Sequence, residues 1–143
     1  MATRTGNLER CIREAEQFIE VAQYCREENK VSPFRLIFPL FMNAAFSCEL
    51  YLKAIAMIES NSATFTDGHK LNDLFSNIST TAQQKIRENY NKKGIYITLD
   101  EMLLKYSNNF IEWRYSFESG SEGNRIGIIG LAESLKEYVD VIK

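Results

Sequence analysis

One stretch of the chain, from Ser32 to about Ser60, limits the possible folds most, because it predicts a helix that is apolar on two opposite sides. One side carries Ile37, Phe41, Ala44, Cys48, Leu52, Ile55 and Ile58, and the other carries Phe46, Leu50, Ala54 and Met57. A helix with two apolar sides must be covered on both of them. It is therefore either central in a bundle or shared with a second subunit. Ser32 and Pro33 suit a cap and a first helical position, and Pro39 predicts a kink or a restart.

The other helices are predicted from apolar residues that recur three and four positions apart. They cover residues 7–29, the segment "KLNDLFSNI", residues 81–90, 98–117 and 125–143, while "NSATFTDGHK" is expected to be a loop. Asn7 is a predicted N-cap, Thr98 and Glu101 form a capping box, and Gly94 is a left-handed residue that ends a helix. The predicted fold class is all-α. We expect one domain over residues 1–143, an antiparallel up-down helical bundle of four long helices plus one or two short ones.

The composition is that of a soluble globular domain, with 143 residues, 45% hydrophobic and 25% charged. A formal net charge of −2 gives no general basic footprint, so charge alone does not predict non-specific binding of nucleic acid. The three cysteines have no C-x-x-C spacing and fall on predicted core faces, which indicates a reducing compartment. With no apolar signal core at the N-terminus, the expected location is the cytoplasm, with no membrane partner.

Several kinds of site are excluded by residue type. With one histidine and no cysteine pair, we expect no metal site, and no cofactor motif is present. Glycines 120, 123, 127 and 130 follow no predicted strand and precede no G-K-[ST], which favours a loop that leads into a closely packed helix over a phosphate-binding loop. The basic residues Lys85, Arg87, Lys92 and Lys93 are a candidate phosphate patch, although a solvated charged face is the more common meaning of such a run.

Five polar residues are the candidate site. Glu49 and Lys53 are four positions apart on one predicted helix, and Arg114 and Glu118 are four apart on another. A carboxylate beside a cation has a lowered pKa, which suits an ion pair better than a general acid. His69, in "DGHKL", is either a capping residue or a functional group that titrates near neutral pH. Arg114 lies about 70° from the apolar seam of its helix, so its guanidinium is expected at the bundle surface or in a groove.

Three short motifs resemble the HEPN superfamily, the higher eukaryotes and prokaryotes nucleotide-binding domains. They are "AAFSCELYLKAIAMIE", "GHKLNDLF" and "FIEWRYSFE", which match the E-L-x-L-K, G-H-x-L and R-Y-x-x-E patterns of small bacterial HEPN-like proteins. The resemblance implies an all-α up-down bundle, commonly homodimeric, in toxin–antitoxin, phage-defence and RNA-processing systems. Catalytic members are metal-independent ribonucleases with R-x(4–6)-H near the start of the last long helix.

This chain departs from the catalytic pattern because no histidine follows Arg114 and His69 lies upstream of it. Our leading hypothesis is therefore a non-enzymatic HEPN-like binding or regulatory module. It is expected to be a homodimer, with an antitoxin or nucleotidyltransferase type of partner protein and RNA or a nucleotide as ligand. One alternative is a metal-independent ribonuclease with a rearranged site in which His69 and Arg114 act together. Another is a nucleotide-binding module that uses the cluster of Glu49, Lys53, His69, Arg114 and Glu118.

Overall fold

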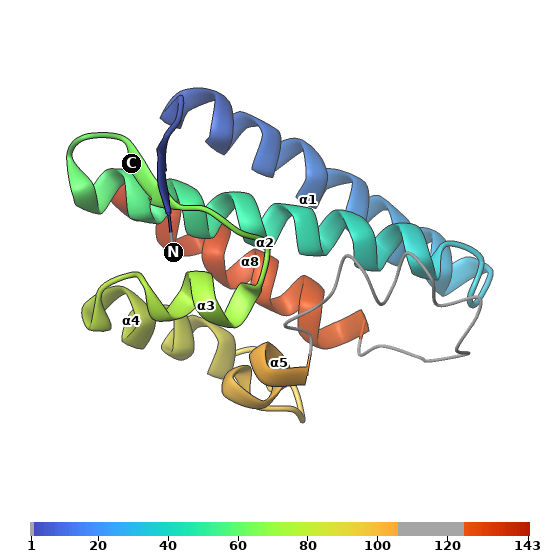
Figure 1. Ribbon diagram of the computed structural model, residues 1–143. Helices are drawn as coiled ribbons and strands as arrows, with labels where there is room; N and C mark the ends of the chain where they lie inside the picture. Colours follow the sequence, from blue (N-terminus) through green and yellow to red (C-terminus); the bar gives the residue numbers. More distant parts are fainter. Residues whose placement is uncertain (1, 106–124) are drawn as a thin grey trace.

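The computed structural model describes residues 2–105 and 125–143, and this part of the chain is mostly helical, as the sequence predicts (Figure 1). The elements in chain order are β1 (Thr3–Thr5), α1 (Leu8–Val31), α2 (Ile37–Ser60), β2 (Thr64–Thr66), α3 (Leu71–Ser76), α4 (Thr80–Asn91), α5 (Leu99–Lys105) and α8 (Arg125–Ile142). The small antiparallel ribbon formed by β1 and β2 was not expected.

Helix α1 begins and packs as its sequence predicts. The side chain of Asn7 accepts a hydrogen bond from the backbone N–H of Arg10 at 2.9 Å, which is the expected N-cap. The helix buries Ala15, Ile19, Ala22 and Cys25. The hydroxyl of Ser47 on α2 donates to the carbonyl oxygen of Ala15 at 3.0 Å, so the two helices lie close together along small residues.

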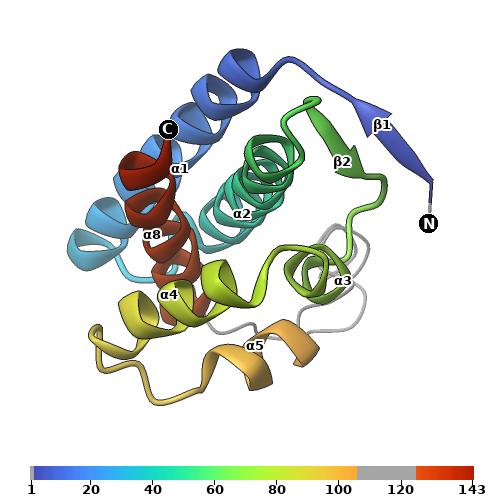
Figure 2. The same cartoon turned by 90° about the vertical axis from the view of Figure 1, so that its left-hand side faces the viewer.

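Helix α2 is the centre of the structure. It packs against α1, α8, α3 and β2, and Figure 2 shows it end-on with these elements around it. Cys48 and Leu52 on one side and Ala54 and Met57 on the other are all buried. Of the helices that the structure describes, α2 is long and apolar enough to cross a bilayer, but 61% of its apolar window is buried inside the protein. Elements of this chain therefore cover much of both apolar sides of α2.

The predicted start of α2 at Ser32 is wrong, because the helix begins at Ile37. The backbone N–H of Ser32 instead donates to the carbonyl of Glu28 at 3.0 Å and closes the end of α1. The chain then turns, and the side-chain oxygen of Asn29 accepts the N–H of Leu36 at 2.7 Å. Pro39 consequently lies in the first turn of α2, where its missing N–H has no intrahelical partner to lose. The helix therefore does not restart at Pro39.

The predicted loop over residues 61–70 contains strand β2, so that prediction is wrong in part. Strand β2 pairs antiparallel with β1, with Thr3 opposite Thr66. An ion pair of 3.2 Å between Arg4 and Asp67 ties the end of the ribbon. Gly6 follows β1, and a Cβ at this position would lie 2.9 Å from an edge carbon of the Phe65 ring. The absence of a side chain at Gly6 therefore lets the N-terminal strand lie against β2.

The remaining helices close the core. Ser79 caps α4 by accepting the N–H of Ala82, and Gly94, three residues after α4, has the predicted left-handed backbone with φ of 67°. Thr98 accepts the N–H of Glu101 at 3.1 Å, as the capping box requires. Helix α8 buries Ile128, Leu131, Leu135 and Val139 in the core that α1 and α2 share. The predicted continuation of the helix from Thr98 to Phe117 lies outside the described residues after Lys105.

Candidate functional site

Three of the five predicted site residues meet on the side of α2 that faces the loop after β2. One carboxylate oxygen of Glu49 lies 2.9 Å from the ammonium nitrogen of Lys53, and the other lies 3.0 Å from Nδ1 of His69. Glu49 and Lys53 are 7% and 8% exposed, whereas the His69 side chain is 72% exposed. The cluster of Glu49, Lys53 and His69 thus has a buried ion pair below and an accessible imidazole above.

Local structure explains why these three residues meet. Glu49 and Lys53 are one turn apart on α2, the spacing at which side chains of a helix touch. His69 lies between β2 and α3, and its position depends on the ribbon and on Gly68, whose φ of 123° favours glycine. The ring of Phe65, from β2, lies 5.3 Å from the Lys53 ammonium and covers it.

The carboxylate of Glu49 fixes the tautomer of His69. An ionised carboxylate only accepts hydrogen bonds, so Nδ1 of His69 must carry the hydrogen in this contact. The other ring nitrogen, Nε2, is an acceptor when the imidazole is neutral and a donor when it is protonated. The arrangement is chemically suited to hold an anion or to transfer a proton.

The thiol beside this cluster is not a nucleophile at neutral pH. Sγ of Cys11 donates to the carbonyl oxygen of Leu50 at 3.1 Å. Burial raises the pKa of Cys11 to about 11, and Glu14 and Glu49 act in the same direction while Lys53 opposes them. Since the thiolate is the reactive form, Cys11 belongs to the packing of α1 on α2 and not to a covalent mechanism.

The other two predicted site residues, Arg114 and Glu118, lie outside the described residues. Their sharing of a site with His69 stays a prediction. Of the candidate phosphate patch, Lys85 lies 3.6 Å from Glu88, and Arg87 lies 2.9 Å from Asp100. These ion pairs favour the charged solvated face over a phosphate site for that part of the run.

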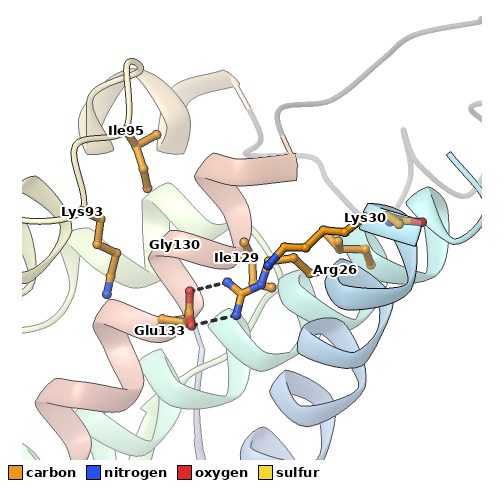
Figure 3. Close-up of a pocket in the computed structure, with 9 residues that line it drawn as sticks. Arg26, Lys30, Lys93, Ile95, Ile129, Gly130 and Glu133 are labelled. Carbon is orange, nitrogen blue, oxygen red and sulfur yellow. Dashed lines mark hydrogen bonds and ion pairs between the residues drawn. The ribbon is translucent and has the colours of Figure 1, made fainter. Parts of the chain in front are cut away.

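A cavity that the sequence did not predict lies between α1, α8 and the loop after α4 (Figure 3). Its volume is about 440 Å³, within the range of small-molecule sites. The lining residues are Arg26, Asn29, Lys30, Leu40, Lys93, Ile95, Ile129, Gly130 and Glu133. They come from four separate segments, so no local motif marks the cavity. The one sequence signal is Gly130, which the sequence places in a closely packed helix.

Comparison with protein-family models, with curated proteins and with solved structures finds no match to this chain. The HEPN resemblance therefore rests on the three motifs alone. Two of them, which contribute Glu49, Lys53 and His69, meet in space, and the third lies outside the described residues.

Proposed function

We propose that this chain is a non-enzymatic, HEPN-like binding or regulatory module, built as an antiparallel up-down helical bundle and acting as a homodimer. The observation that carries the proposal is the pairing of Glu49. Its carboxylate is buried and shared between Lys53 and His69, so it organises the loop between β2 and α3. Because both oxygens of this carboxylate are already paired, Glu49 is poorly placed to act on a ligand itself. The group that this cluster presents to a partner is the exposed imidazole of His69.

The homodimer part is supported by exposed apolar side chains on α1 and at the start of α2. Val21, Tyr24 and Val31 are 44%, 59% and 84% exposed, and their spacing places them on one side of α1. Phe38 is 46% exposed on α2. Sedimentation of the purified protein should give a dimer that Tyr24→Glu converts to a monomer. A wild-type protein that stays monomeric at high concentration contradicts the dimer.

The biological setting of the proposal comes from the sequence resemblance alone. It is a toxin–antitoxin or phage-defence system of a prokaryote, in the cytoplasm, with an antitoxin or nucleotidyltransferase type of partner and with RNA or a nucleotide as ligand. Fluorescence anisotropy with labelled RNA tests the ligand. Binding should weaken in His69→Ala, and the surface variant Arg13→Ala serves as control because Arg13 is 61% exposed on α1.

A second candidate function is a metal-independent ribonuclease in which His69 and Arg114 act on one phosphate. The observation that favours it is the oriented, 72% exposed imidazole of His69, since a histidine buried against backbone would have excluded this role. Arginine would hold the phosphate through two hydrogen bonds, and histidine would transfer the proton.

One assay separates the two functions. Purified protein is incubated with single-stranded and structured RNA in the presence of a chelator, beside His69→Ala, Arg114→Ala and Arg13→Ala. The binding module predicts no cleavage by any of them. Cleavage by the wild type and by Arg13→Ala that is lost in both site variants establishes the ribonuclease and overturns the leading proposal.

A further inference from the structure

The cavity between α1, α8 and the loop after α4 has an apolar floor and a polar rim. Leu40 and Ile129 on the floor are 2% and 3% exposed, and Ile95 covers them from the loop. Gly130 lies beneath Ile95, and a Cβ at this position would overlap Cδ1 of Ile95. The missing side chain therefore lets the loop descend onto α8. Figure 3 shows Ile95 above and Lys93 and Arg26 on either side of Glu133.

The rim carries three cations and one carboxylate. Arg26 and Glu133 form a two-pronged ion pair, with nitrogen–oxygen distances of 2.9 and 3.4 Å, and Gln23 also donates to Glu133 at 3.3 Å. The carboxylate of Glu133 thus accepts three hydrogen bonds from α1. The ammonium groups of Lys30 and Lys93 bond Glu27 and Glu137, two residues that do not line the cavity. An ammonium group has three donors, so each lysine keeps this pair and still donates into the cavity.

A buried donor on the same wall calls for an acceptor. The side-chain oxygen of Asn29 accepts the N–H of Leu36 at 2.7 Å, which fixes the orientation of the amide. Its nitrogen, Nδ2, is buried and has no hydrogen-bond partner among the described residues. A buried polar group without a partner costs about 1–3 kcal/mol, so such groups usually mark a missing water, ion or ligand. Because the orphan atom is a donor, this wall of the cavity favours an acceptor over a second donor.

We propose that this cavity binds a small organic anion, with an apolar or aromatic body on Leu40, Ile95 and Ile129 and a carboxylate or phosphate group that accepts hydrogen bonds from Lys30 and Lys93, beside the amide of Asn29. The apolar floor sets the body of the ligand. Three cations against one carboxylate among the lining residues, together with the orphan donor, favour an anionic head group. A neutral or cationic analogue has the apolar body but lacks the anionic head group. The proposal is independent of the proposed function, since the cluster of Glu49, Lys53 and His69 contributes nothing to this cavity.

The test uses four phenyl compounds as probes in ligand-detected NMR titrations with the full chain. Phenylacetate and phenyl phosphate carry the anionic head group, and they distinguish a carboxylate site from a phosphate site. Phenylacetamide is the neutral analogue and phenethylamine the cationic one. The two anions, or one of them, should bind saturably, with an affinity that falls as salt is added.

Two variants reverse or remove the recognition, and Lys92→Gln is the control for the loss of a charge. Asn29→Asp keeps an oxygen for the N–H of Leu36 but replaces the orphan donor by a negatively charged acceptor, so anion binding should be lost. Lys93→Gln should weaken it about tenfold, the effect of one charged hydrogen bond. Lys92→Gln, at the exposed neighbouring position outside the cavity lining, should leave the affinity within about twofold of wild type.

Three results overturn the proposal. They are the absence of saturable anion binding by the folded wild type, equal binding of all four probes, and unchanged anion binding in Asn29→Asp and Lys93→Gln. Circular dichroism establishes that each variant is folded. Should Asn29→Asp fail to fold, Lys30→Gln replaces it, because the Lys30 side chain is 65% exposed and its loss leaves the core intact. An affinity unchanged in both Lys30→Gln and Lys93→Gln then overturns the proposal.

Discussion

Removing the carboxylate of Glu49 is the most informative perturbation of the cluster formed by Glu49, Lys53 and His69. In Glu49→Leu the ammonium of Lys53 stays in a site where the residue is only 8% exposed, with the Phe65 ring 5.3 Å away. A cation–π contact contributes about 0.5–2 kcal/mol, less than the desolvation of an ammonium group costs. His69 loses a hydrogen bond too, but its 72% exposed side chain returns to water at little cost.

Breaking a buried ion pair by removing one partner typically costs about 3–5 kcal/mol. We expect Glu49→Leu to lower the free energy of unfolding by that amount, a large part of the stability of a domain of this size. The double variant Glu49→Leu/Lys53→Met removes both charges and keeps an apolar side chain at each position. Its stability should return to within about 1 kcal/mol of wild type, because no charge is left uncompensated.

Urea unfolding followed by far-UV circular dichroism measures all three stabilities. The control is Glu14→Leu, which breaks the Arg10–Glu14 pair, four residues apart and 3.0 Å long but exposed. It should cost no more than about 1 kcal/mol. A loss below 1 kcal/mol in Glu49→Leu, equal to that of Glu14→Leu, would refute the reasoning. Lys53 would then reach water without rearrangement, and the pair would hold no loop in place.

Three further changes have defined outcomes. Asn7→Ala removes the N-cap of α1 and should lower the free energy of urea unfolding by about 1 kcal/mol, whereas the exposed Gln17→Ala should change it by less than half as much. Gly94→Ala places a Cβ at φ of 67° and should cost about 1–2 kcal/mol in the same assay, and an unchanged value would mean that the turn relaxes. Burial raises the pKa of Tyr90 from 10.0 to about 12, so the stability that its neutral phenol contributes is complete below pH 10 and is lost as the pH rises towards 12. Tyr90→Phe should cost about 1 kcal/mol at neutral pH, since the hydroxyl donates to Ile97, and should flatten the alkaline slope of stability in a pH series.

The long helices were predictable because their signals are local. Helix α1 repeats its apolar residues every three to four positions, and its cap at Asn7 precedes the pattern by one residue. Helix α8 follows the same rule from Arg125 to Ile142. The start of α2 was not predictable, because Ser32 and Pro33 have the composition of a helix start. The contact that places the start elsewhere joins Asn29 to Leu36 across a turn.

The ribbon could not be read from the sequence. All three residues of β1 are exposed, so they show no alternation of buried and exposed positions, and their hydrogen-bonding partners lie beyond α1 and α2. Separation along the sequence also decides which contacts of the site were predictable. Helical spacing alone brings Glu49 beside Lys53, whereas the contact of Glu49 with His69 depends on the ribbon that carries the chain back past α2. The cavity lined by Asn29, Lys93 and Gly130 likewise depends on contacts between segments that are far apart in the sequence.

The pairing of Thr3 with Thr66 also has a kinetic meaning. The two strands are joined through both long helices, and a contact that closes so long a loop forms late, after the local helices have made their own contacts. His69 lies just beyond Asp67, the residue that Arg4 holds at the end of the ribbon. We therefore expect the imidazole to reach its place on Glu49 only in the last stage of folding. During folding, the core helices would therefore form before His69 becomes ordered.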